Sequence, residues 1–105
     1  AQAKQRKLQL ELDQVTLNVQ TEVRDAASEY NQTYLRVLAA QEELAAAREL
    51  ERGELDRFEE GIGTLFLVNQ RERARAEAET KLVDTRVELE IARLGFLATT
   101  AQLNP

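Results

Sequence analysis

Apolar residues recur every three or four positions along almost the whole chain. Between Leu8 and Val37 the steps are 4, 3, 4, 4, 3, 4, 4 and 3, close to an 11-residue repeat, which predicts nearly straight helical packing. From Val37 to Phe58 the step becomes seven, which favours left-handed supercoiling. The first row is Leu8, Leu12, Val15, Val19, Val23, Ala26, Tyr30, Tyr34 and Val37, and the second continues through Leu44, Glu51 and Phe58.

A second periodic stretch carries two apolar tracks instead of one. Two tracks make a wide apolar face, wider than a single partner helix can cover. The first track is Val83, Val87, Ile91, Leu94, Ala98 and Ala101, and the second is Leu82, Leu89, Phe96 and Leu103.

The pattern predicts two helices and one turn. The only proline is Pro105, so nothing in the interior forbids a helix. We expect the first helix over about 4–58, a tip turn over 59–64 and the second helix over about 65–102. The expected fold is all-α, a long antiparallel two-helix coiled-coil hairpin that occupies the whole chain as one unit.

The turn residues support this arrangement. Gly61 is typical of a left-handed helix C-cap, and Thr64 is typical of a helix N-cap. Because the turn is short, the second helix returns antiparallel to the first. Folding the chain at position 61 is expected to place Tyr30 beside Ala92, and to leave residues before about 18 without a partner. Acidic and basic residues then lie opposite each other near the turn: Glu49, Glu51, Glu54 and Asp56 against Arg71, Arg73 and Arg75.

Composition excludes several kinds of function. The chain has 105 residues, 31% of them charged and 43% hydrophobic, with no Cys and no His. Without these side chains we expect no zinc or other metal site, no cofactor, and no catalytic residue, and therefore no enzyme. The net charge of −5 argues against a nucleic-acid partner. No run of 18 apolar residues exists, so we expect no membrane contact by this segment.

The stretch "FEEGIGTLFLV" (residues 58–68) combines the turn with a dense apolar group. Around a helix, Leu65, Phe66, Leu67 and Val68 point in all directions, and one antiparallel partner covers only one or two of them. Contiguous exposed apolar surface usually marks an interface. Two interpretations remain open at this point: a four-helix bundle made by two hairpins, or a hairpin that is one stave of a larger barrel.

The chain resembles the second periplasmic helical hairpin of the TolC-type outer membrane factors, the outer membrane efflux protein family. The resemblance covers about residues 12–104, so we expect the chain to be a fragment of such a protein. "FEEGIGTLFLV" is similar to the family's tip pattern of an aromatic residue, glycine, threonine and an apolar run. "EVRDAASEY" (residues 22–30) and "LEIARLGFLATTAQLN" (residues 89–104) are similar to the descending and closing parts of the family's hairpin.

The resemblance implies a conduit. Members of the family are trimers whose hairpins form a periplasmic α-barrel, and whose tips narrow its entrance and meet a periplasmic adaptor protein. The adaptor links the channel to an inner-membrane pump in multidrug efflux or type I secretion. Carried onto this chain, the adaptor-contacting tip comprises Phe58, Glu59, Glu60, Gly61, Ile62, Gly63 and Thr64. Entrance constriction or packing between hairpins falls on Leu65, Phe66, Leu67 and Gln70.

One departure concerns the entrance. Many family members carry acidic residues in the apolar run after the tip, and here the matching positions are Leu67 and Gln70. An apolar constriction built from Phe66 or Leu67 would close the entrance differently from an acidic one.

Two alternatives remain beside this reading. The chain could be the coiled-coil hairpin of the adaptor itself, although adaptor tips carry an Arg-Leu pattern that residues 58–68 lack. It could also be a generic coiled-coil scaffold, which has no need of exposed Ile62, Phe66 and Leu67.

Overall fold

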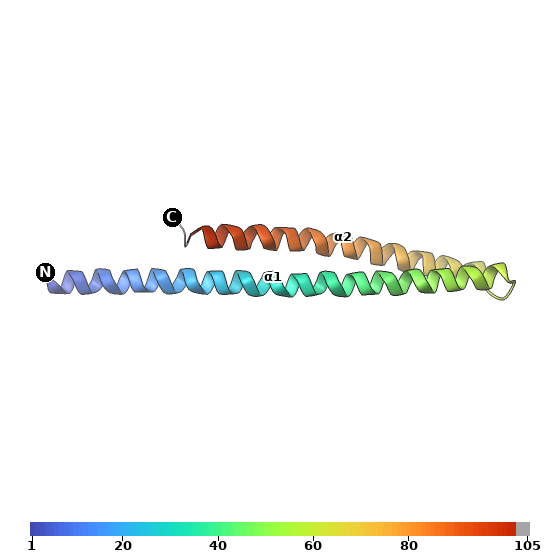
Figure 1. Ribbon diagram of the computed structural model, residues 1–105, viewed down its shortest axis with the longest axis horizontal. Helices are drawn as coiled ribbons and strands as arrows, with labels where there is room; N and C mark the ends of the chain where they lie inside the picture. The colour runs from blue at the N-terminus through green and yellow to red at the C-terminus, as the bar shows by residue number, and fades with distance from the viewer. Residues whose placement is uncertain (103–105) are drawn as a thin grey trace. The chain divides into compact units, whose positions relative to one another are not determined.

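The computed structural model describes residues 1–102 and consists of two α-helices joined by a short turn (Figure 1). Helix α1 spans Gln2–Glu59 and helix α2 spans Leu65–Ala101, against expected ranges of about 4–58 and 65–102. The described part of the chain contains no strand. The chain is therefore all-α, an antiparallel two-helix coiled-coil hairpin, as the apolar periodicity predicts.

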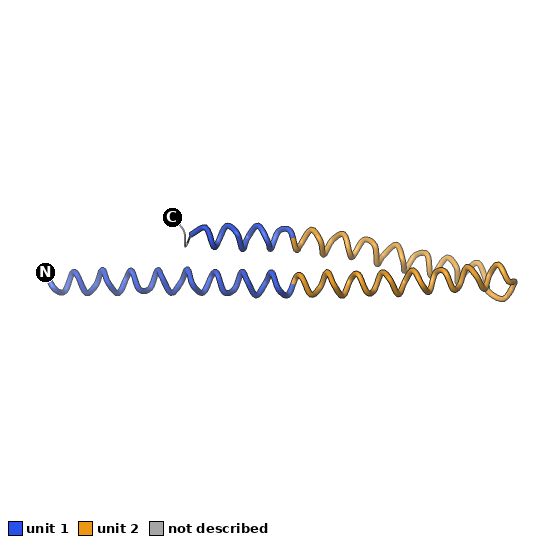
Figure 2. Tube along the Cα trace, in the orientation of Figure 1, with its two compact units in different colours: residues 1–32, 90–105 blue, residues 33–89 orange. Residues whose placement is uncertain are grey.

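The hairpin divides into two compact units, which Figure 2 colours separately. The tip unit is Thr33–Leu89 and contains the turn with the helical segments on both sides of it. The base unit joins Ala1–Gln32 to Glu90–Pro105. The chain is predicted from its sequence to be one hairpin unit. The tip unit and the base unit are described separately below.

The tip unit is held together by a narrow apolar core. Val37, Ala40 and Leu44 of α1 cluster with Ala78 and Leu82 of α2, and all five side chains are buried. Small alanines alternate with larger aliphatic residues, which lets the two helices approach closely.

The buried row follows a seven-residue repeat. Steps of three and four residues alternate along it in both helices, as in a coiled coil. We call this row the seam. In the tip unit the seam consists of the buried or half-buried residues Thr33, Val37, Ala40, Leu44, Ala47, Glu51 and Glu54 of α1 and Val68, Arg71, Arg75, Ala78, Leu82, Thr85 and Leu89 of α2.

The predicted 11-residue repeat is wrong where it reaches the tip unit. Thr33 is 1% exposed in the seam, whereas Tyr34, which the repeat placed inside, is 47% exposed. Thr33 lies seven residues before Ala40, so the seven-residue repeat of the seam places Thr33 inside. The buried Thr33 hydroxyl accepts a hydrogen bond from Arg36 at 3.2 Å.

Ion pairs across the seam set the register of the tip unit. Arg75 Nε donates to Glu51 Oε2 at 2.6 Å, and Lys81 Nζ reaches Glu43 Oε2 at 2.9 Å. Of the acidic and basic groups expected to face each other, only Arg75 and Glu51 form a cross-helix pair in the described residues. The other two cross-helix pairs, each at 3.5 Å, are Arg36–Glu88 and Arg48–Glu79.

The base unit is packed more loosely. Tyr30 and Phe96 face each other with ring centroids 6.3 Å apart. The ring contact is therefore with Phe96, one helical turn from the expected partner Ala92. Every residue before Val19 is exposed, in agreement with the predicted unpaired start of α1. Leu103 lies outside the described residues.

We predict that Leu44→Ala destabilises the hairpin. The Leu44 side chain is 6% exposed in the centre of the core cluster, so its truncation leaves a cavity there. The free energy of unfolding in urea is expected to fall by about 2 kcal/mol or more. Leu35→Ala is the matched control because Leu35 is exposed, and it should change stability by less than about 0.5 kcal/mol. Equal losses in both variants would contradict the assigned core.

The hairpin tip as candidate functional site

The end of α1 is closed by a Schellman-type cap. Gly61 has a φ of +78°, the left-handed conformation predicted for it. The Gly61 amide donates to the Phe58 carbonyl at 3.0 Å, and the Ile62 amide donates to the Arg57 carbonyl at 2.9 Å. These bonds satisfy carbonyls that would otherwise be unpaired at the helix end, and they fix the direction in which the chain leaves α1.

The start of α2 is capped as predicted. Thr64 Oγ1 accepts a hydrogen bond from the Leu67 amide at 3.2 Å, and the Thr64 carbonyl accepts one from the Val68 amide at 3.2 Å. With a cap on each side, residues 60–64 form a defined turn. It is one residue shorter than the tip turn predicted over 59–64, and from here on the name tip turn means residues 60–64.

The second glycine of the tip turn provides room instead of conformational freedom. Gly63 does not have a positive φ. A Cβ at this position would lie 3.2 Å from Glu54 Oε1 and 3.4 Å from the Phe58 nitrogen. The first contact is tighter than ordinary packing and the second lies at its lower limit, so a side chain at position 63 would require the Glu54 carboxylate to shift slightly.

The residues around the tip turn present an apolar surface. Ile62 is 61% exposed and Phe66 is 69% exposed. Val68, the last residue of the apolar run, is instead buried in the seam. The hairpin thus covers one of the four consecutive apolar residues and leaves three outside. The exposed members of this surface, the apolar tip, are Phe58, Ile62, Leu65, Phe66 and Leu67.

The polar residues predicted at the tip also face outward. Glu59 ends α1, Glu60 begins the turn, and both are exposed, as is Gln70 on the first turns of α2. Leu67 lies next to this group and carries no charge. The structure therefore brings the predicted tip residues together around one turn, with Gly63 half-buried and Thr64 exposed.

Charged side chains occupy the seam directly behind the tip. Arg75 donates to Glu51 across the seam and also pairs with Glu79 at 3.1 Å on its own helix. Hydrogen bonds to Glu51 and then to Glu79 raise the pKa of the Arg75 guanidinium above its ordinary value. This group therefore stays positively charged across the physiological pH range.

Sequence reasoning did not identify Glu54 and Arg71 as members of the seam. Both were expected only among the acidic and basic residues that face each other near the turn, but Glu54 is buried and Arg71 is half-buried. The signal was present, because steps of three and four from Leu44 lead through Ala47 to Glu51 and Glu54. The charge of these residues concealed the periodicity.

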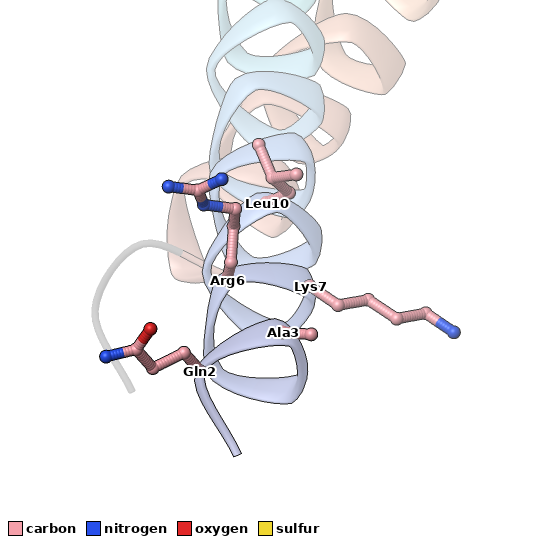
Figure 3. Close-up of a pocket in the computed structure, with 5 residues that line it drawn as sticks. All are labelled: Gln2, Ala3, Arg6, Lys7 and Leu10. Atoms are coloured by element: carbon pink, nitrogen blue, oxygen red, sulfur yellow. The ribbon is translucent and has the colours of Figure 1, made fainter.

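The hollows elsewhere on the surface are weaker candidates for a binding site than the tip. A shallow groove of the tip unit is lined by Ala46, Ala47 and Leu50 of α1 and by Arg71, Ala74 and Ala78 of α2, with Glu43 at its edge. Figure 3 shows a hollow at the start of α1. All of its lining residues belong to one helix, and the side chains of Gln2 and Lys7 point away from each other, so they do not converge on a ligand.

No group of three or more potential metal ligands occurs in residues 1–102. Neither helix, over its described length, has an 18-residue window apolar enough to cross a membrane. The side chains that distinguish the tip are apolar or acidic, and they are exposed.

Compared with known protein families, with curated proteins and with solved structures, the chain gives no match.

We predict that Gly61→Ala and Gly53→Ala change stability in opposite directions. The positive φ of Gly61 strains any side chain there, so its replacement is expected to cost about 1–2 kcal/mol. Gly53 lies inside α1, where a Cβ would meet nothing within 4 Å, and its replacement should stabilise the hairpin by about 0.5–1 kcal/mol. Thermal unfolding of the two variants measures both effects, and a stabilised Gly61→Ala would contradict the cap.

Proposed function

We propose that this hairpin is part of the periplasmic conduit of a TolC-type outer membrane channel and docks through its tip to a periplasmic adaptor protein. The observation that carries the proposal is the apolar tip: Ile62 is exposed on the tip turn, which is capped on both sides, and Leu65 and Phe66 are exposed on the first turn of α2. A rigid exposed apolar surface loses little conformational entropy when it is covered, which favours docking.

The sides of the hairpin support the proposal as well. Val83 and Val87 of the tip unit are exposed, as are Ile91 and Leu94 of the base unit. These residues form the first apolar track of α2, whereas the second track supplies Leu82 and Leu89 to the seam. One helix partner covers one track only, so the other is available to neighbouring hairpins in a barrel wall.

Trimers of the full protein would supply those neighbours. In this proposal the inner-membrane pump is reached only through the adaptor. Leu67 and Gln70 take the positions of the family's acidic residues, so Phe66 and Leu67 would narrow the entrance with apolar side chains. An apolar constriction excludes water and ions without binding cations.

A dimer of hairpins is the second candidate, and the same exposed track favours it. Two hairpins that pair through Ile91 and Leu94 would form a four-helix bundle with no role in transport. The exposed apolar tip distinguishes the candidates because such a bundle covers the sides of the hairpins and does not require an apolar turn.

We predict that tip substitutions weaken adaptor binding. Ile62→Ser and Phe66→Ser each remove apolar surface from the proposed contact, and about a tenfold weaker Kd is expected for each. Binding of the 105-residue chain to a periplasmic adaptor from the source genome, measured by surface plasmon resonance, provides the test. Leu35→Ser is the matched control because Leu35 is as exposed as Ile62 but lies on α1 away from the tip turn. Equal affinities for all variants would rule out tip docking.

We predict that the isolated chain self-associates weakly, at most as a trimer. Its mass, measured by sedimentation equilibrium, should rise above the 11.9 kDa monomer only at high concentration. Ile91→Glu combined with Leu94→Glu should keep the chain monomeric, because buried carboxylates are costly, whereas Leu35→Glu should not. A stable closed trimer would contradict weak association, and a concentration-independent dimer would favour the four-helix bundle.

A further inference from the structure

The seam contains two consecutive charged layers near the tip. Glu51 of α1 faces Arg75 of α2 and is paired with it at 2.6 Å. The next layer towards the turn lies three residues later in the sequence on α1 and four residues earlier on α2. It contains Glu54 and Arg71, so an acid and a base again occupy one layer.

The second layer is unpaired. Glu54 is 9% exposed, and its Oε1 atom is buried without a hydrogen-bond partner. In residues 1–102, no ion pair is formed by Arg71, which is half-buried at the end of the alanine-lined groove. The carboxylate lies under the tip turn instead, where a Cβ on Gly63 would be 3.2 Å from Oε1.

This arrangement leaves the Glu54 carboxylate in a costly state although Arg71, a natural partner for it, occupies the same layer. A buried carboxylate oxygen without a donor loses its hydration and gains nothing in return. Arg71 carries five N–H donors on a long side chain and occupies the position equivalent to that of Arg75. Because Arg75 and Glu51 pair from the equivalent positions, we expect rotation of the Glu54 and Arg71 side chains to bring the guanidinium to the oxygen.

We propose that Glu54 and Arg71 form a switchable salt bridge that is open in this structure. The Glu54 carboxylate has two positions: beneath Gly63, as observed, or on the Arg71 guanidinium. In the second position the space beneath Gly63 is vacated, and the tip turn loses the side chain that it packs on. The state of this pair therefore controls how firmly the tip turn is held, independently of which partner the tip contacts.

A double-mutant cycle on the 105-residue chain tests the pairing. Arg71→Gln is expected to lower the midpoint of thermal unfolding by about 2–3 °C, because the open and closed positions are comparably populated and the closed one can no longer form. In a chain that already carries Glu54→Gln, the same substitution should cause little further change. Arg73→Gln is the matched control, since Arg73 is an exposed arginine two residues away and should leave the midpoint unchanged.

Two results of this cycle would overturn the proposal. One is an Arg71→Gln midpoint equal to that of Arg73→Gln, which would mean that the pair never closes. The other is an equal loss from Arg71→Gln with and without Glu54→Gln, which would assign the effect to packing of the arginine side chain.

Gly63→Ala tests the link to the turn. The added methyl group would crowd Glu54 Oε1 and favour the position on Arg71. Arg71→Gln should therefore lower the midpoint more in the Gly63→Ala chain than in the native one. Amide exchange of Ile62, whose N–H donates to the Arg57 carbonyl, should also be faster in Gly63→Ala than in the native chain. An unchanged effect of Arg71→Gln in the Gly63→Ala chain would disprove the coupling between the pair and the turn.

Discussion

The packing of α1 against α2 along one narrow seam is the constraint on which the rest of the molecule depends. A coiled-coil contact accepts only the residues at alternating steps of three and four, so each helix can cover one row of its partner. Val37, Ala40 and Leu44 occupy that row with Ala78 and Leu82, and residues 1–102 contain no third helix that could cover the other faces. Apolar residues on those other faces therefore remain largely exposed, whatever their hydrophobicity.

Near the turn this constraint produces an inverted distribution of side chains. The seam there holds Glu51, Glu54, Arg71 and Arg75, while the apolar residues of the tip face outward. A chain selected only to fold as an isolated hairpin would gain stability by exchanging the two sets. The arrangement makes physical sense if another molecule covers the outer surface and if the charged layers serve to set the register of the two helices.

Much of this fold could be predicted from the sequence, because its causes are local. The lack of interior proline, the glycine at the C-cap and the threonine at the N-cap each act within a few residues, and Gly61 and Thr64 have the roles assigned to them. Which residues of each helix lie in the seam was harder to predict from the sequence. Thr33 and Tyr34 are neighbours, and only the packing of the second helix decides which of them is buried. The functions of the tip residues stay predictions, since they depend on a partner that the chain does not contain.

The two glycines of the tip turn show how one sequence pattern can have two physical causes. Gly61 is required by the backbone, because its φ of +78° ends α1 and reverses the chain. Gly63 is favoured by its surroundings, because a side chain there would crowd the Glu54 carboxylate. The first glycine determines where the hairpin turns, and the second allows a buried acid to lie beneath that turn. A tip built in this way is fixed in shape by its caps, and in our proposal it is adjustable in stability through the charge under it.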